Sequence, residues 1–283
     1  MLIIIDKKVI EIIDYALSLY LTNLLMYSMT VTNGIIKLVA SLSQKKNRDD
    51  QGCFVAEGTK CVRDTWDFFN CKMIIATKEW YEQCGHSGHL DKIYFATKSQ
   101  MQKMSQFSTA SDVIAVYETP VYDIKREEIE NDLNIVLDGI QDPGNLGTIM
   151  RLADWYGIKN IFCSKTTVDV FNHKVVQATM GAISRVKVYY CDLLDLFDEY
   201  REIPVYGTFL EGKNIYKADL SERGFVVFGN EGRGISKELR DVIDRKLLIP
   251  SYPQGVVTSE SLNVGVAAAI TISEFRRRII TNK

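Results

Sequence analysis

One stretch of the chain, LDGIQDPGNLGTIMRLADWYG (137–157), carries polar side chains at a spacing that could act on a phosphate-bearing substrate. Asn145, Thr148 and Arg151 lie three residues apart, so in a helix they share one face. We expect the helix to begin near Asn145, because asparagine is a good N-cap and the preceding Pro-Gly pair makes a tight turn. An arginine there suits a phosphate. A capping asparagine with a surface arginine would give the same pattern, so this segment alone leaves both interpretations open.

A second stretch, FVVFGNEGRGISKEL (225–239), places three glycines after an apolar run. Glycines at Gly229, Gly232 and Gly234 would let the backbone approach a ligand closely. The spacing G-x-x-G-x-G is not that of a dinucleotide site, and Glu231 would repel a pyrophosphate but could bond a hydroxyl or an amine. A plain strand-to-helix turn explains one glycine well and three poorly.

The third stretch, LLIPSYPQGVVTSESLNVGVAAAI (247–270), contains a strand expected to end at Pro250, a long loop, and then the last helix. Ser261 and Asn263 stand at the expected start of that helix. Simple capping by Ser259 or Ser261 is the alternative explanation for these polar residues.

The elements that must position these stretches alternate between apolar, β-branched runs and helix-like segments. We expect a final helix over 261–279 and strands over 135–140, 160–164, 185–190, 204–209, 225–230 and 246–251. Near-continuous apolar strands separated by helices predict a parallel sheet covered on both faces. Ligands of such sheets bind outside the carboxyl ends of the strands, where all three stretches begin.

The N-terminal part predicts a separate small α/β domain over 34–118, joined by a charged linker over 119–134 to a larger domain over 135–283. Some helix is expected within 125–131 of the linker. In the small domain we expect a helix over 59–69 and strands over 53–58, 73–77, 92–97 and 112–118.

Residues 1–28 are apolar but interrupted by charges at Asp6, Lys7, Lys8, Glu11 and Asp14. The segment has no apolar run of about 18 residues, so a membrane-spanning helix is not expected. The order of its charges is also wrong for a signal peptide. An extra amphipathic helix remains possible by pattern. We favour a start at Met29, with an upstream segment that is absent from the native protein, because the segment carries no motif.

The composition sets limits on partners. Lys and Arg number 34 and Asp and Glu 36, so the net charge is −2 and nucleic acid could be bound only by local basic patches. The six cysteines form no C-x-x-C pair, which indicates reduced thiols and a cytoplasmic protein. Cys84, His86 and His89 lack a fourth ligand at a familiar spacing, so we expect a surface loop and no metal site.

Together the three stretches resemble the motifs of the SpoU/TrmH family in the SPOUT methyltransferase superfamily. The shared motifs are N-x-G-x-x-x-R at Asn145–Arg151, G-N-E-G-x-G at Gly229–Gly234, and I-P with S-L-N-V at Ile249–Pro250 and Ser261–Val264. They occur in the family's order and span most of 135–275. The small domain looks like the ribosomal-protein-like RNA-binding module that often precedes this catalytic domain, a looser match.

The resemblance implies a parallel sheet with a trefoil knot that holds S-adenosylmethionine. It assigns the cofactor to Thr208, Phe209, Leu210, Phe228, Gly229, Asn230, Gly232, Ile249, Pro250 and Leu262. It assigns catalysis to Arg151, surrounded by Asn145, Glu231, Ser261 and Asn263. It assigns RNA contacts to Lys46, Arg48, Glu57 and Arg151. Because a guanidinium rarely loses its proton, we expect Arg151 to fix a phosphate and stabilise developing negative charge, and not to act as a base.

The implied function is methylation of a ribose 2′-hydroxyl in ribosomal or transfer RNA, by a homodimer without metal or membrane. The alternative is an RNA-binding or ribosome-assembly factor that kept the fold and lost catalysis. A nucleotide-dependent oxidoreductase is disfavoured by the glycine spacing. Two departures from the family concern the cofactor: the loop between Pro250 and Ser261 is longer than the common form, and Ser251 stands where methionine is common.

Overall fold

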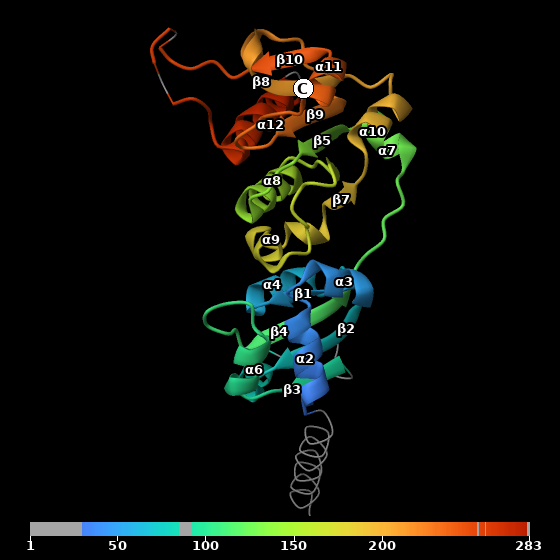
Figure 1. Cartoon of the computed structure of the whole chain (residues 1–283), viewed down its shortest axis with the longest axis vertical. Coiled ribbons are helices and arrows are strands. Elements are labelled where there is room, and N and C mark those ends of the chain that lie inside the picture. Colours follow the sequence, from blue (N-terminus) through green and yellow to red (C-terminus); the bar gives the residue numbers. More distant parts are fainter. Residues whose placement is uncertain (1–29, 85–91, 254, 258, 282–283) are drawn as a thin grey trace, which may run out of the picture. The chain divides into compact units, whose positions relative to one another are not determined.

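The computed structural model describes residues 30–84, 92–253, 255–257 and 259–281, and Figure 1 shows the path of the chain. The upstream segment 1–28 and the two histidines of the proposed surface loop, His86 and His89, lie outside the described residues. The predictions made for them stay predictions. Within the described chain no helix has the length and apolar character needed to cross a bilayer.

The chain divides into two compact units. One runs to Val62 and resumes over Asn70–Glu118, and the other combines Arg63–Phe69 with the chain from Thr119 onward. The predicted linker 119–134 therefore lies within the second unit, where it contributes a helix and the first residues of a strand.

The first unit is built on a four-stranded sheet in the order β1-β4-β2-β3. Strand β4 pairs antiparallel with β1 and β2, whereas β2 and β3 are parallel. The strands are β1 (Cys53–Glu57), β2 (Cys71–Ala76), β3 (Ile93–Phe95) and β4 (Val113–Glu118). The helices are α2 (Asn33–Ser41), α3 (Lys45–Gln51), α4 (Thr59–Thr65), α5 (Lys78–Cys84) and α6 (Lys98–Met104). The predicted helix 59–69 is too long, because the chain must turn after Thr65 to enter β2.

The second unit contains a six-stranded sheet in the order β10-β8-β9-β5-β6-β7. Every pair of neighbours is parallel, which confirms the predicted parallel sheet. The strands are β5 (Leu133–Asp138), β6 (Asn160–Cys163), β7 (Lys187–Tyr190), β8 (Val205–Asn214), β9 (Gly224–Gly229) and β10 (Arg245–Leu248). The trefoil threading expected from the resemblance fits this order but stays a prediction.

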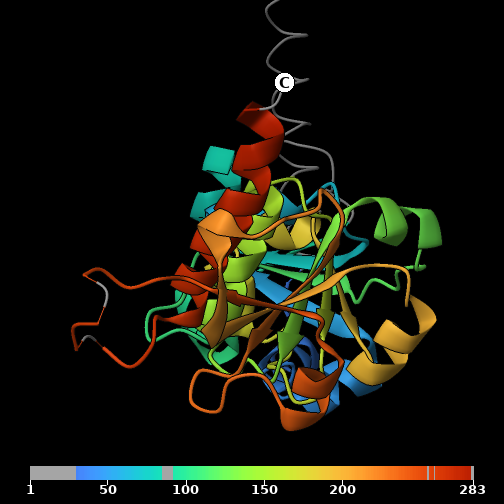
Figure 2. The ribbon, with the colours of Figure 1, turned by 90° about the horizontal axis from the view of Figure 1, so that it is seen from above.

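Helices cover both faces of this sheet (Figure 2). Val205 on β8 belongs to the apolar cluster formed with α10 and α11, whereas the next residue, Tyr206, meets Phe275 of α12 edge to face at 4.9 Å between ring centroids. Successive residues of a strand face opposite sides, so α12 lies across the sheet from α10 and α11. The helices are α7 (Arg126–Asn131), α8 (Pro143–Trp155), α9 (His173–Ala178), α10 (Leu193–Glu199), α11 (Lys237–Val242) and α12 (Val264–Thr281), with short 3-10 turns η2 (Ala182–Ser184) and η3 (Ile215–Lys217).

The structure corrects the predicted start of α8. The helix begins at Pro143, and Asp142, not Asn145, is its cap: the Asp142 carboxylate accepts a hydrogen bond from the backbone nitrogen of Asn145 at 2.8 Å. Proline suits the first turn of a helix because the N–H that it lacks would have no helical partner there. The side chain of Asn145 is therefore available for contacts outside the helix.

The last helix and the last strand also differ from their predicted bounds. Helix α12 begins at Val264, and Asn263 caps it by accepting from the backbone nitrogens of Gly265 and Val266 at 2.9 and 3.3 Å. Capping by Ser259 or Ser261 is therefore wrong. Strand β10 ends at Leu248, before Pro250, because a proline has no N–H to offer a strand ladder.

Candidate functional site

The candidate site lies along the carboxyl ends of four neighbouring strands. In the spatial order β10-β8-β9-β5, the segments are Ile249–Pro250 after β10, Thr208–Leu210 within β8 just past its pairing with β9, Gly229–Gly232 at the end of β9, and the turn that leads from β5 into α8. Parallel neighbours end at the same edge of a sheet. Four segments far apart in the sequence therefore meet at one edge, as the motifs predict.

Strand β8 opens at this edge. It pairs with β9 as far as Gly207. Its pairing with β10 then shifts, because the consecutive β10 residues Lys246 and Leu247 face Gly207 and Lys213 of β8. The residues between form a bulge, 208–212, which we call the β8 bulge. Its start is held by the Thr208 hydroxyl, which donates to the carbonyl of Val227 at 3.2 Å, while Leu210 is 75% exposed.

The glycines after β9 form a closed turn, which we call the glycine turn (229–235). The backbones of Asn230 and Gly234 exchange two hydrogen bonds, at 3.0 and 2.8 Å. The Asn230 side chain accepts from the backbone nitrogens of Gly232 and Arg233 at 3.0 and 3.1 Å. A side chain at Gly229 would overlap the backbone where Gly234 joins Ile235. These contacts make the turn compact, so a side chain at Gly229 would not fit.

The glycine turn is fastened to the neighbouring strand β5. The Asn230 amide donates to the carbonyl of Gly139 at 2.7 Å, and the backbone nitrogen of Ser236 donates to the Asp138 carboxylate at 2.7 Å. Gly139 has φ +71°, which favours glycine there. Its backbone nitrogen in turn donates to the Ser164 hydroxyl at 2.9 Å, which joins the loop after β6.

Asn145 links two other predicted catalytic residues, Glu231 and Asn263. Its amide nitrogen donates to the Glu231 carboxylate at 2.9 Å, and its amide oxygen accepts from the Asn263 amide at 2.9 Å. These bonds join α8, the glycine turn and the start of α12. We call Asn145, Glu231 and Asn263 the polar node. Because the Asn263 oxygen caps α12 at the same time, the orientation of that amide is defined at both ends.

Arg151 lies on the same exposed face of α8 as Asn145 and Thr148. Thr148 packs where a side chain at Gly265 of α12 would stand, and Gly147 is pressed against Ala178 of α9. Helix α8 is thus held on two sides while Arg151 is exposed and makes no hydrogen bond or ion pair with the described residues. Its guanidinium is available to a ligand.

Ser261 is not brought into the polar node. It is exposed and forms no hydrogen bond with other described residues, two positions before the Asn263 cap. The predicted role of Ser261 in catalysis stays a prediction.

The residues expected to hold S-adenosylmethionine fit that group in most positions. The glycine turn offers backbone groups. Among the other expected cofactor residues, Phe209, Ile249 and Pro250 are half-buried and Leu262 is 47% exposed, so each leaves apolar surface accessible. Backbone groups together with apolar surface suit an adenosine better than they suit a highly charged ligand. Phe228, however, has no exposed surface, so the prediction that it contacts the cofactor is wrong; it packs inside the sheet.

Two of the predicted RNA contacts are corrected in the first unit. Arg48 is 4% exposed, and its guanidinium donates to the carbonyls of Leu42 and Ser43 at 2.9 Å each. Glu57 is 5% exposed and accepts from Ser105, Gln106 and Ser111. Both are committed to holding local turns. Lys46 is exposed, as an RNA contact requires.

Residues that position the site were missed in the sequence. Asp142 caps α8 and Asp138 holds Ser236, and neither was among the expected site residues. The Asp-Pro pair before the helix was an available signal, because it combines a favoured cap with a favoured first helical residue. No local pattern marks Asp138, whose partner lies 98 residues away.

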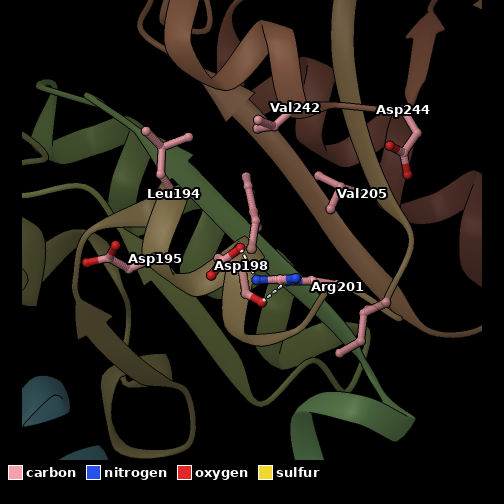
Figure 3. Close-up of a pocket in the computed structure, with 9 residues that line it drawn as sticks. Leu194, Asp195, Asp198, Arg201, Val205, Val242 and Asp244 are labelled. Atoms are coloured by element: carbon pink, nitrogen blue, oxygen red, sulfur yellow. Dashed lines mark hydrogen bonds and ion pairs between the residues drawn. The ribbon is translucent and has the colours of Figure 1, made fainter.

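A hollow of about 490 Å³ elsewhere on the second unit is not part of this site. It lies between α10, α11 and the start of β8, and Figure 3 shows Asp195, Asp198 and Arg201 around it. None of its lining residues belongs to the glycine turn, the β8 bulge or the polar node.

Two parts of the chain match known families. Residues 132–273 match the SpoU rRNA methylase family, and residues 33–115 match the MRM3-like substrate binding domain. The chain is 29% identical over 248 residues to the 23S rRNA (guanosine(2553)-2′-O)-methyltransferase RlmP of Bacillus subtilis. That alignment covers 86% of this chain and 96% of the relative.

Solved structures resemble the chain over a similar extent. A protein of the TrmH family from Porphyromonas gingivalis has a TM-score of 0.79 and 36% identity, covering 88% of this chain and 99% of that one. An rRNA methyltransferase from Sinorhizobium meliloti with bound AdoMet has a TM-score of 0.77 and 28% identity, covering 89% of this chain and 97% of that one.

Proposed function

The chain belongs to the SpoU rRNA methylase family, and on that premise we propose that it is an RNA ribose 2′-O-methyltransferase that uses S-adenosylmethionine. The family resemblance predicted from the three motifs is thereby confirmed. A ribose 2′-hydroxyl exists in RNA and not in DNA, so the substrate is RNA.

The observation that carries the proposal is the junction of the polar node with the segments expected to hold the cofactor. Glu231 belongs both to the node and to the glycine turn, at 2.9 Å from the amide of Asn145. A reacting hydroxyl and a methyl donor must be held together in alignment, and a shared residue links the two halves of such a site. The inert factor of the same fold would have no use for this junction.

When bound, S-adenosylmethionine supplies a methyl group on a sulfonium centre. The glycine turn, the β8 bulge, Ile249–Pro250 and Leu262 would hold it. Arg151 binds the phosphate next to the reacting ribose and stabilises negative charge that develops on the 2′-oxygen. The polar node keeps α8 and the glycine turn in register, so that Arg151 stays beside the cofactor segments. A phosphate oxygen or a water takes the hydroxyl proton, because the guanidinium stays protonated.

The first unit serves as the RNA-binding part, as its match to a substrate binding domain suggests. Exposed Lys46 offers one phosphate contact. The RlmP enzyme, which aligns along nearly its whole length, is named for 23S rRNA, so ribosomal RNA is the first substrate to test and transfer RNA the second. We also propose that the enzyme acts in the cytoplasm, where both kinds of RNA occur.

We also propose that the enzyme is a homodimer. Trp155 of α8 is 84% exposed and Val266 of α12 is 48% exposed, on two helices that pack against each other. Large exposed apolar side chains on neighbouring helices offer a surface that a second copy of the chain would cover. Light scattering after gel filtration should give the mass of a dimer for the wild type and of a monomer for Trp155→Glu. A monomeric wild type would contradict the dimer.

The test of function is a map of 2′-O-methylated positions in ribosomal and transfer RNA from cells with and without the gene. We expect one or a few positions to lose the modification and to regain it when the gene is restored. Isothermal titration of the purified chain with S-adenosylmethionine should give saturable binding. An unchanged methylation map together with no uptake of the cofactor would refute the proposal.

A further inference from the structure

The guanidinium of Arg240, on α11, donates hydrogen bonds to the glycine turn. Its Nε donates to the carbonyl of Ile235 at 2.7 Å, and its Nη2 donates to the carbonyl of Arg233 at 3.3 Å. Hydrogen bonds from a charged donor are stronger than those between neutral groups. A side chain at Gly234 would stand 3.1 Å from the same Nη2. The guanidinium therefore lies directly against the far end of the turn.

The same guanidinium also faces the β8 bulge. Its central carbon is 5.9 Å from the ring centroid of Phe209, and the Nζ of Lys246 on β10 is 5.4 Å from that centroid. Cations attract the face of an aromatic ring at such distances. Phe209 packs against the apolar cluster beneath α10 and α11, and a side chain at Gly207 would collide with its ring. The Phe209 ring therefore contacts the apolar cluster, and the cationic groups of Arg240 and Lys246 both lie near it.

These contacts are not those of an ordinary surface arginine. Both side-chain hydrogen bonds of Arg240 go to backbone carbonyls of the glycine turn. The turn is fastened on its other side to Gly139 by Asn230. The turn is therefore held at Gly139 by Asn230 and at α11 by Arg240.

We propose that Arg240 is a positioning residue for the cofactor, which clamps the glycine turn to Phe209 and so keeps the spacing between two segments that hold S-adenosylmethionine. The inference rests on the proposed function. It names a residue outside the three motifs, on a helix that none of them includes. Because the clamp orders both segments before binding, losing it moves the ordering cost into the binding step.

The test is isothermal titration of the full-length chain with S-adenosylmethionine, using Arg240→Met and the matched control Lys237→Met. Lys237 lies on the same helix and is exposed, and its substitution by methionine removes the same charge. We expect Arg240→Met to raise the Kd about tenfold, equivalent to about 1.4 kcal/mol. Arg240→Lys should recover part of the affinity, because lysine keeps a cation near the ring and one donor. Lys237→Met should bind like the wild type.

A second readout separates positioning from general damage. Methyl incorporation into total RNA from cells lacking the gene, at saturating cofactor, should stay within about twofold of wild type for Arg240→Met, so the defect lies in KM and not in kcat. Wild-type Kd in Arg240→Met, or equal weakening in Lys237→Met, would overturn the clamp. If Arg240→Met does not fold, Phe209→Leu must weaken binding instead, and wild-type affinity there has the same consequence. No binding by the wild type would refute the proposed function itself.

Discussion

Two polar regions of the second unit differ in how their side chains are connected. In the hollow of Figure 3, Arg201 bonds Asp198, three residues earlier in the chain, and both side chains are 71% exposed. At the carboxyl edge of the sheet, Asn145 bonds Glu231 and Asn263, which lie 86 and 118 residues away. The hollow is held by a local pair, whereas the edge has connections between distant segments.

The difference shows which polar groups are held in advance of any ligand. An exposed pair a few residues apart can form in a solvated helix end and is worth about 0–1 kcal/mol. A contact between segments that only the folded sheet brings together keeps its geometry because the fold has already ordered both sides. Pre-organised polar groups are what catalysis uses. Connection between distant segments therefore distinguishes the candidate site from the hollow.

The largest effect should come from Arg151, the exposed cation on α8. Arg151→Ala removes the group that stabilises negative charge at the substrate, and we expect turnover to fall about a thousandfold. Cofactor affinity should stay within about twofold, because Arg151 lies outside the segments that hold it. Methyl incorporation into RNA from cells lacking the gene measures the first, and titration the second.

The matched arginine of the hollow provides the control. Arg201→Ala should retain turnover within about twofold, since its local pair touches nothing at the edge. Equal losses in Arg151→Ala and Arg201→Ala would erase the distinction between the two regions.

Breaking the polar node itself should have the next largest effect. Asn145→Ala cuts both long-range bonds, and we expect turnover to fall about a hundredfold because α8 and the glycine turn lose their common register. Asn263→Ala cuts one of them and also removes the cap of α12, so it should lower turnover less and destabilise the fold by about 1 kcal/mol. Rates and urea unfolding curves of the two variants test this order. A larger loss of turnover in Asn263→Ala would reverse it.

Substitutions within the glycine turn should separate close packing from mere turn composition. Gly229→Ala places a methyl group into the backbone at Gly234 and Ile235, which should lower the free energy of unfolding by about 1–3 kcal/mol. Gly232→Ala meets only Asn230, at 3.8 Å, and should change it by less than about 0.5 kcal/mol. Thermal melting of both variants is sufficient. Equal stability would mean that the turn opens without cost.

The smallest effect concerns a long-range contact that serves stability alone. Glu274 of α12 is 5% exposed and accepts from Arg277 and Arg278, and Arg278 donates onward to the carbonyls of Ala218 and Ile215. The hydrogen bond from Arg277, with that from Arg278, lowers the pKa of Glu274 below its ordinary value. A carboxyl whose folded pKa is depressed stabilises the fold above its unfolded pKa and loses that contribution as the pH falls through the folded pKa.

Glu274→Gln should therefore lower the free energy of unfolding by about 1 kcal/mol at neutral pH, with unchanged turnover. The difference from wild type should be constant from about pH 8 to pH 6 and shrink below about pH 4.3. Denaturant titrations at several pH values measure it. A difference that grew toward acid pH would contradict the assigned direction of the pKa shift.

Local pattern predicted most of the second unit. Apolar β-branched runs marked each strand of the parallel sheet, because such residues fill a sheet that is buried on both faces. The three motifs followed strand ends, so their meeting at one edge was expected once the strands were parallel. Arg48 and Glu57 show the limit of this reasoning. Both residues were predicted to contact RNA and are buried. Glu57 accepts from groups 48 to 54 residues away, and Arg48 donates to backbone carbonyls, which no residue type signals.

Helix starts were predicted less well than strands, for a related reason. Asn145 and Ser261 are both acceptable caps, and the choice of Asp142 and Asn263 depends on where the chain leaves its strand or loop. The consequence concerns the site, because Asp142 takes the cap of α8 and leaves both ends of the Asn145 amide to Glu231 and Asn263.

By itself the sequence determined the parallel α/β class, the order of the motifs and the residue types at the site, because hydrophobic period and turn chemistry act over a few residues. The tertiary structure alone decided that Asn145 links the glycine turn to α12 and that the Arg240 guanidinium lies near Phe209. These outcomes depend on which distant segments share an edge of the sheet, and no short stretch of sequence contains both partners.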